Sequence, residues 1–305
     1  MYLPSQKTIT DPIEFEGIGL HNGKSVHICL KPAEVNSGIK FKRTDISNNN
    51  IIEANFKNVS SSLLCTKIEN SHGVSVSTIE HLMAAFYGEG IDNVVVEINS
   101  PEVPIMDGSA FDFVESIRAA GIQKQEYSKK IIKVLKKIEV REGSKFISIE
   151  PCEKDLIIDF EIVYNNPLIR TRRKEFKLSN GNLDSIYNSK TFCLYEDIDQ
   201  IKSQGLAKGG SLENAIVVKD NKILNDDGLR YKDEFVNHKI LDCLGDLMLS
   251  GHRIYGHVKT SQGGHQLTNT LLNNFFSDKS NWKFEEIKEK ENKDNDYVRP
   301  LAVTA

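Results

Sequence analysis

The sequence predicts an α+β protein of two similar domains, each a layer of mostly β-sheet packed on helices, with a small insert in each. One observation behind this prediction is the order of elements, because strands, a helix, a strand and a second helix follow one another in both halves. The other is a short echo, HNGKSVHICLKP at 21–32 and REGSKFISIEP at 141–151, in which a turn leads into an alternating strand. Together they predict a duplicated unit.

The first domain is expected over residues 1–126. It opens with strand-like alternation at 25–30 and at 38–43. A helix is predicted at 78–88, because glycines at 88 and 90 end its periodic pattern. The strand VVVEI follows at 94–98, and a second helix at about 109–120 ends at Gly121.

The second domain is expected over residues 127–279, with its boundary near the charged stretch 123–130. Strands are predicted at 131–141, 145–150 and 156–164, and a mixed segment at 183–219. A long amphipathic helix is predicted at about 229–250, stopped by Gly251. A strand at 252–260 and a helix at 265–276 complete the unit.

The last segment, residues 280–305, changes in character. It contains the charge-dense stretch KFEEIKEKENKDNDY and ends in VRPLAVTA, so a flexible tail is expected. A frayed terminus is the simpler interpretation, and a recognition segment for a protease or partner is the alternative.

Composition limits the classes of function. The 305 residues, 39% hydrophobic and 27% charged, are typical of a soluble globular protein. The formal net charge of -4 argues against a general nucleic-acid binder. The N-terminus has no signal-peptide pattern, and no run approaches the roughly 18 apolar residues of a membrane helix, so a cytoplasmic protein without an integral membrane segment is expected. Five scattered cysteines with no C-x-x-C pair favour reduced thiols and argue against a cysteine zinc site.

The motif STIEH at 77–81 places a carboxylate and a histidine side by side near a helix start. Ser77 and Glu80 have the spacing of a capping box, which would give Glu80 a purely structural role. His81 taken alone also fits a packed histidine in the first helical turn. The motif therefore indicates a functional site only if a second cluster of polar residues accompanies it.

That second cluster is the stripe His238, Asp242 and Asp246 on the long helix, whose members recur one turn apart. A charged stripe of this kind is often a solvated face. Asp242 and Asp246 repel one another, however, and a metal at the first with a histidine at the second would relieve the repulsion. Two histidines and a carboxylate as ligands, with a further carboxylate as base, are what a catalytic zinc site needs.

His265 follows two glycines at a predicted helix start. A histidine in such a turn is usually polar surface. With a carboxylate such as Asp246 to orient it and keep it protonated, it can instead act as an acid or stabilise an oxyanion.

Several longer stretches, in order along nearly the whole chain, resemble the LpxC family of UDP-3-O-acyl-N-acetylglucosamine deacetylases of lipid A (lipopolysaccharide) biosynthesis. They begin with GIGLHNGK at 17–24 and end with GGHQLTN at 263–269. Between these lie STIEHLMAAFYGEGIDNVVVEINSPEVPIMDGSA at 77–110, KTFCLYEDI at 190–198, GLAKGGSLENAIVV at 205–218 and LNDDGLRYKDEFVNHKILDCLGDL at 224–247.

The resemblance implies an active site between the two domains, with zinc, or Fe²⁺ at the same ligands, bound by His81, His238 and Asp242. Glu80 would activate zinc-bound water. His265, oriented by Asp246, would stabilise the oxyanion or protonate the leaving amine, and Thr191 would donate a hydrogen bond to the tetrahedral intermediate.

The resemblance also implies that the substrate is UDP-3-O-acyl-N-acetylglucosamine and that a segment at about 190–217 shelters its acyl chain. Substrate contacts are expected at Leu64, Cys65, Phe192, Asp197, Ile198, Gly210, Leu212, Ala215 and Lys239, with Val217 as a further lining residue or ordinary core. A monomer is expected.

Two other functions stay open on the sequence: a catalytically silent protein that binds an acylated nucleotide sugar, and a metal-independent α+β module whose His/Asp stripe is structural. Retention of every ligand type and of both acid–base candidates speaks against the silent binding protein, and the family resemblance speaks against both.

Overall fold

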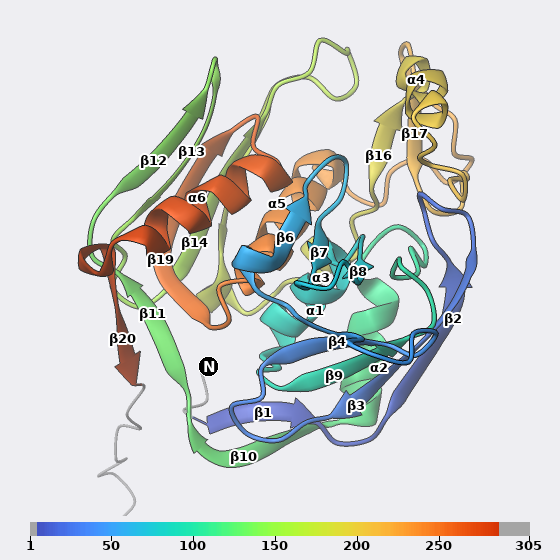
Figure 1. Ribbon diagram of the computed structural model, residues 1–305. Helices are drawn as coiled ribbons and strands as arrows, with labels where there is room; N and C mark the ends of the chain where they lie inside the picture. Colours follow the sequence, from blue (N-terminus) through green and yellow to red (C-terminus); the bar gives the residue numbers. More distant parts are fainter. Residues whose placement is uncertain (1–4, 287–305) are drawn as a thin grey trace, which may run out of the picture.

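The computed structural model describes residues 5–286 and shows an α+β fold in which helices lie between two large sheets (Figure 1). The predicted fold class is confirmed. No helix within 5–286 combines the length and the apolar character that a membrane crossing requires.

The first sheet has five strands in the order β2-β3-β9-β4-β5. Its strands are β2 (Ile13–Ile18), β3 (Ser25–Pro32), β4 (Ile39–Arg43), β5 (Ile51–Glu53) and β9 (Val94–Ile98). Alternate side chains of β4 and β9 are fully or almost fully buried, which is the period expected of a half-buried strand. The helices of this half are α1 (Glu80–Glu89) and α2 (Phe111–Ala120).

The second sheet contains β12 (Ile138–Glu142), β13 (Lys145–Glu150), β14 (Leu156–Ile162), β15 (Arg172–Lys177) and β19 (Arg253–Ser261). It also includes β11 (Lys130–Val134) and β20 (Trp282–Glu286). The helices α5 (Glu234–Met248) and α6 (His265–Ser277) pack on this sheet.

The two halves repeat one topology strand by strand. In the first half β2–β3, β3–β9 and β4–β5 are antiparallel pairs, while β4–β9 is parallel. In the second half β12–β13, β13–β19 and β14–β15 are antiparallel, while β14–β19 is parallel. The echo in the sequence therefore falls on equivalent strands, β3 and β13, and α1 corresponds to α5.

Each half carries an insert just before its first long helix, as predicted. In the first half the insert is a small sheet of β6 (Val59–Ser61), β7 (Lys67–Glu69) and β8 (Ser75–Val76), preceded by the short η1 (Phe56–Asn58). The second-half insert has the sheet β16 (Phe192–Leu194), β17 (Ile216–Lys219) and β18 (Lys222–Ile223). Its helical pieces are η2 (Leu178–Asn180), α3 (Asp184–Tyr187), η3 (Tyr195–Asp197) and α4 (Ile198–Ser203), and α4 marks its outer end in Figure 1.

The equivalent helices α1 and α5 pack directly against each other at the centre of the molecule. Gly245 makes this close approach feasible, because a Cβ atom there would lie 2.0 Å from the carbonyl oxygen of Glu80. The N-terminal end of α1 therefore contacts the middle of α5, where the polar stripe predicted from the sequence lies.

Two predicted elements differ from the structure. The single strand predicted at 131–141 is two strands, because β11 pairs with β19 and β20 whereas β12 pairs with β13. The long helix begins at Glu234 instead of residue 229. The Glu234 carboxylate accepts hydrogen bonds from the backbone N–H groups of Arg230 and Lys190, at 2.6 and 3.0 Å, which fixes the chain in a non-helical approach to the helix.

The ends of the predicted domains also show additional strands. The charged stretch at the expected boundary lies mostly in β10 (Ile122–Ser128), which pairs antiparallel with β1 (Ser5–Ile9). The boundary after residue 126 stays a prediction. The expected tail, 280–305, begins with the end of η4 (Lys279–Asn281) and with β20, which pairs with β11, so this part belongs to the second sheet. The rest of that prediction, and the protease handle with it, lies outside the described residues.

Candidate metal centre and active site

Three candidate ligands come together where α1 meets α5. His81 is the second residue of α1, and His238 and Asp242 lie one turn apart on α5. The Nε2 atoms of both histidines are 3.5 Å from the same atom, Asp242 Oδ1, and the ligand atoms all lie within 4.8 Å of one another. All three side chains are buried. The sequence prediction that these residues meet is therefore matched by the structure.

Hydrogen bonds around this group leave one ligand atom of His238 and one of Asp242 available. The backbone carbonyl of Ser189 lies 3.0 Å from His238 Nδ1 and can only accept, so Nδ1 carries the hydrogen and Nε2 keeps its lone pair. Lys239 Nζ donates to Asp242 Oδ2 at 2.9 Å, which leaves Oδ1 facing the two histidines.

The charge states suit a metal ion. Burial lowers the pKa of His238 to about 3, so its ring is neutral. Burial would raise the pKa of Asp242, but its cationic and hydrogen-bonding neighbours, Lys239 among them, outweigh burial and hold the pKa well below its usual value. Two histidines and one carboxylate are among the sets of three protein ligands found at catalytic zinc sites, so the donor set fits zinc.

Glu80 precedes His81, and its carboxylate contacts Thr66 and His265. Its Oε2 accepts a hydrogen bond from the backbone N–H of Thr66 at 3.0 Å, and its Oε1 lies 3.8 Å from His265 Nε2. The Ser77 hydroxyl donates to the carbonyl of Pro101, so the alternative of a capping box does not occur. Burial raises the pKa of Glu80, which makes its carboxylate a stronger base than an exposed one.

His265, the first residue of α6, lies against the last member of the α5 stripe. Its Nδ1 is 2.8 Å from Asp246 Oδ2. Burial alone would lower the pKa of His265, but the Asp246 carboxylate outweighs burial and raises the pKa to about 10. His265 is therefore a cation at neutral pH. Asp246 is itself buried, so the alternative of a solvated charged face does not describe this stripe.

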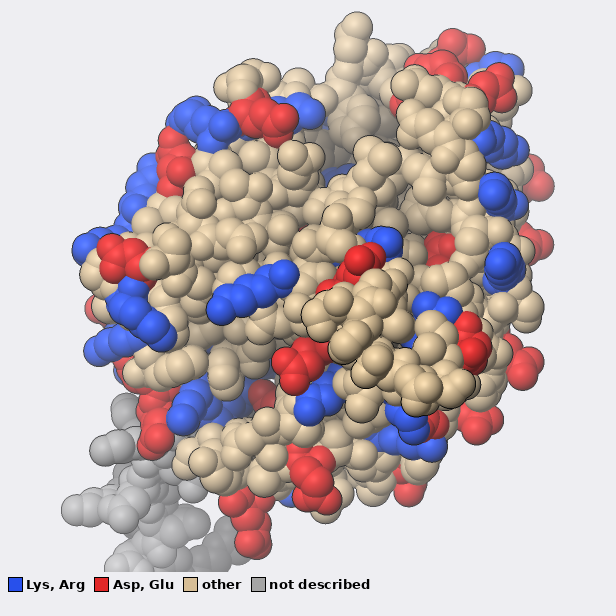
Figure 2. Space-filling model, in the orientation of Figure 1, with Lys and Arg blue, Asp and Glu red and all other residues tan. Residues whose placement is uncertain are grey.

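A cavity of about 690 Å³ opens beside these residues, between the second-half insert and the second sheet. Figure 2 shows a recess at the top of the view. Most of the residues predicted to contact substrate line the cavity: Leu64, Phe192, Asp197, Ile198, Gly210, Leu212, Ala215, Val217 and Lys239. Two of the predicted catalytic residues, Thr191 and His265, line it as well.

The inner end of the insert is fixed to the helix that carries two ligands. The ring of Phe192 packs edge-on against Phe235 of α5, with centroids 4.9 Å apart, and against Tyr164 at 5.6 Å. The N–H of Lys190 donates to Glu234 at the start of α5. The inner wall of the cavity is thus built on the same element as the metal ligands.

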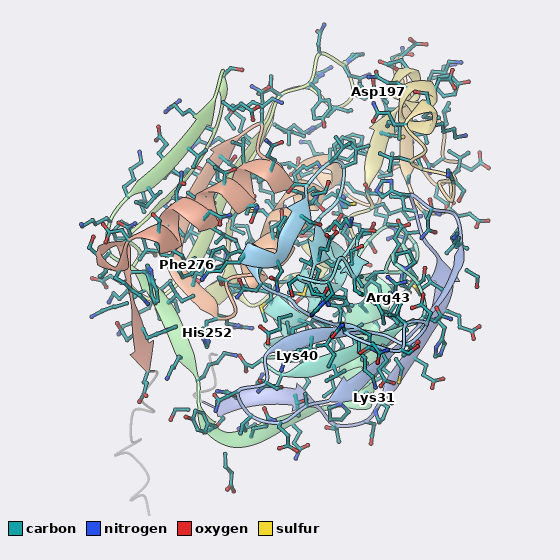
Figure 3. All side chains as sticks on the ribbon, viewed as in Figure 1. Lys31, Lys40, Arg43, Asp197, His252 and Phe276 are labelled. Atoms are coloured by element: carbon teal, nitrogen blue, oxygen red, sulfur yellow. The ribbon has the colours of Figure 1, made fainter. Side chains whose placement is uncertain are left out.

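Two predicted substrate contacts lie apart from the rest. Cys65 is buried and is absent from the cavity lining, and burial raises the pKa of its thiol to about 12. Asp197 lines the cavity but is exposed beside α4, at the outer end of the insert (Figure 3). Both contacts stay predictions.

Sequence reasoning missed two residues that the structure brings to the site. Thr66 contacts both Glu80 and Asp246, and His21 lines the cavity with a buried Nε2 that has no hydrogen-bond partner within residues 5–286. Glu102 holds the His21 backbone through a hydrogen bond of 2.7 Å. The motif GIGLHNGK contains His21 and was a usable signal, whereas no local pattern marks Thr66.

Comparisons with known proteins agree with this geometry. Residues 6–277 match the LpxC family, described as UDP-3-O-acyl N-acetylglycosamine deacetylase. The chain is 41% identical to the UDP-3-O-acyl-N-acetylglucosamine deacetylase of Mannheimia succiniciproducens and 40% identical to that of Histophilus somni, covering 98% of each chain. It is 41% identical to that of Actinobacillus succinogenes, over 94% of both chains. With a match over nearly its whole length and relatives at this identity, the chain belongs to the LpxC family of UDP-3-O-acyl-N-acetylglucosamine deacetylases.

Proposed function

We propose that this chain is a zinc-dependent deacetylase that hydrolyses the N-acetyl group of UDP-3-O-acyl-N-acetylglucosamine and releases acetate, in lipid A biosynthesis. The observation that carries the proposal is the meeting of His81, His238 and Asp242, with Glu80 and His265 beside them and outside the ligand set. The names of the relatives supply the substrate.

Zinc would be held by the Nε2 atoms of the two histidines and by Asp242 Oδ1. When bound, it supplies Lewis-acid chemistry, polarising the amide carbonyl and lowering the pKa of water toward 7. Fe²⁺ would fit the same nitrogen and oxygen ligands.

Glu80 acts as the general base in this proposal. Its Oε2 is held by the N–H of Thr66, so Oε1 is the oxygen left to accept a proton from the attacking water. The pKa of Glu80 is raised toward neutral pH compared with that of an exposed carboxylate. Glu80 can therefore both accept a proton from water and release it later in the reaction. The proton can later pass to the departing amine.

His265 supplies positive charge opposite Glu80. With Nδ1 bonded to Asp246, its Nε2–H points to the side of the site where Glu80 Oε1 lies. There it can stabilise the oxygen that becomes negative as water adds to the amide carbon, or protonate the nitrogen as the C–N bond breaks. A preorganised donor of this kind typically contributes about 3–4 kcal/mol to transition-state stabilisation.

The rest of the substrate is assigned to the cavity. Phe192, Ile198 and Leu212 offer apolar surface for the acyl chain, and each buried methylene contributes about 0.8 kcal/mol. Lys239 lines the same cavity, and Asp242 raises its pKa despite burial, so it is a fixed cation near the polar head group. Thr191 lines the same cavity and is assigned a hydrogen bond to the tetrahedral intermediate.

The test is acetate release from substrates of graded acyl length, with and without added zinc. Wild-type protein should release acetate, and Glu80→Gln should lower kcat by about 10²–10⁴-fold while retaining its zinc, because it removes the base but no ligand. Metal content is measured on the same samples.

Three outcomes would separate the alternatives. Wild-type rates in Glu80→Gln would make the base assignment wrong. Binding of the substrate with zinc present but without acetate release would favour the silent binding protein. No stoichiometric metal, with stability unchanged by chelation, would favour the metal-independent module.

A further inference from the structure

Thr66 is a buried residue between β6 and β7, in the insert of the first half, and only 2% of its surface is exposed. Its backbone N–H donates to Glu80 Oε2 at 3.0 Å. Its hydroxyl donates to Asp246 Oδ1 at 2.6 Å, a contact between residues 180 positions apart in the chain. One residue of the first half thus contacts a carboxylate from each half of the site.

Because of these two hydrogen bonds, one oxygen of each carboxylate contacts Thr66 and the other faces His265. Glu80 gives Oε2 to Thr66 and turns Oε1 toward His265 Nε2, at 3.8 Å. Asp246 gives Oδ1 to Thr66 and Oδ2 to His265 Nδ1, at 2.8 Å. The histidine is therefore placed between two carboxylates that share a single anchor.

The hydroxyl does something that packing alone does not. The terminal torsion of an aspartate is broad and roughly two-fold, so the side chain by itself does not fix the plane of its carboxylate. A hydrogen bond of 2.6 Å from a hydroxyl to a carboxylate oxygen is short and charge-assisted, and it fixes that plane. The direction of the Asp246–His265 bond then follows from Thr66.

We propose that Thr66 is a positioning residue of the deacetylation reaction, whose hydroxyl orients Asp246 and, through it, His265 toward the base Glu80. This proposal rests on the proposed function above and deepens it. It makes the first-half insert part of the acid–base machinery, although the insert supplies neither a metal ligand nor the base.

The first test compares Thr66→Val, which keeps the shape and removes the hydroxyl, with Thr66→Ser, which keeps the hydroxyl. Thr66→Val should lower kcat by about 10–100-fold with KM changed less than about twofold and zinc content unchanged, since the change acts on the chemical step. Thr66→Ser should restore most of the rate. Equal losses in both variants, or a loss confined to KM, would overturn the proposal.

A double-mutant cycle tests whether Thr66 acts through Asp246. In an Asp246→Asn background the further loss from Thr66→Val should be less than about threefold, because the partner of the hydroxyl has already changed. Additive losses would overturn the proposal. Thr8→Val is the matched control: the hydroxyl of this buried threonine in β1 accepts a hydrogen bond from the backbone N–H of Ala33 at 3.1 Å, away from the cavity, and the kcat of the variant should equal the wild-type value.

A spectroscopic reading keeps the two proposals distinguishable. In protein with ¹⁵N-labelled histidine, the His265 Nδ1–H resonance should shift and exchange faster with water in Thr66→Val, but not in Thr66→Ser or Thr8→Val. Absence of acetate release in wild-type protein would overturn the proposed function, while this resonance would still decide the role of Thr66. An unchanged His265 resonance in folded Thr66→Val would overturn the positioning role of Thr66.

Discussion

One side-chain atom is held by the protein and another is left for chemistry in each of His238, Asp242, Glu80 and His265. Lys239 donates a hydrogen bond to Oδ2 of Asp242, and the backbone carbonyl of Ser189 accepts one from Nδ1 of His238. Thr66 donates hydrogen bonds to one oxygen of Glu80 and to one oxygen of Asp246, and the other oxygen of Asp246 contacts His265. Such support fixes the working atoms before a substrate arrives, which lowers the reorganisation needed during the reaction.

The pH dependence of the reaction should report the Asp246–His265 pair. The protonated histidine is the working form, and its pKa of about 10 lies above the ordinary value of about 6.5. Activity should therefore be present below pH 10 and decline as the pH rises through it. In Asp246→Asn the charge that raises the pKa is gone, so the basic limb of kcat/KM against pH should move down by more than about one pH unit.

The control for this prediction is Glu80→Gln measured over the same pH range. Its rate should be low throughout, but its basic limb should remain closer to the wild-type position than that of Asp246→Asn, because the Asp246–His265 bond is intact. A basic limb unchanged in Asp246→Asn would contradict the assignment of His265 as the proton donor.

The ligands could be predicted from the sequence because part of their geometry is local. His238 and Asp242 are four residues apart, and a helix places such residues on one face. Thr66 could not be predicted, because its partner Asp246 is 180 residues away and its importance depends on how two helices pack. The buried state of Asp246, which rules out a solvated stripe, is likewise a property of packing.

Among the elements, the contact of α1 with α5 has the narrowest tolerance. A Cβ atom at Gly245 would lie 2.0 Å from the carbonyl oxygen of Glu80, and backbone cannot yield as a flexible side chain does. Gly245→Ala should force the two helices apart and move His81 away from His238. We expect a loss of about 1–3 kcal/mol in the free energy of unfolding, together with weaker zinc binding.

Denaturant unfolding with and without zinc measures both effects of Gly245→Ala. The stabilisation that zinc adds to the variant should be smaller than the stabilisation it adds to wild-type protein. A variant that is destabilised but gains the full zinc effect would show that the helix contact does not determine the ligand geometry.

The elements that were predicted well have strong local signals. The strand at 94–98 is found with those bounds, and the glycine at 90 adopts the left-handed conformation (φ 79°) that ends α1. The break between β11 and β12 was missed, because both segments have strand-like sequences and only their partners differ. β20 was missed for a related reason: its charged sequence resembles a solvated tail, and its position depends on pairing with a distant strand.

At the scale of the whole molecule, metal binding should be coupled to folding. His81 and His238 are more than 150 residues apart in the chain, so the unfolded state offers no assembled site. Zinc at 100 times its Kd should add about 2.7 kcal/mol to the free energy of unfolding. Chelation should lower Tm, and stoichiometric zinc should restore it. His238→Ala, which lacks a ligand, should show a much smaller response in the same thermal scans.

The connection between the two halves is itself part of the folded structure. β10 pairs with β1 along its length, and the next residue, Lys129, contacts Asp92 and the carbonyl of Gly90 before β11 enters the second sheet. A hinge at this point would have to break a strand ladder and a buried ion pair. Rocking of one half against the other would therefore cost much free energy as a way to admit an acylated nucleotide sugar. Exposed Tyr195 and Leu212 border the cavity at the outer end of the second-half insert. We therefore expect substrate and product to exchange there, by local movement of the insert.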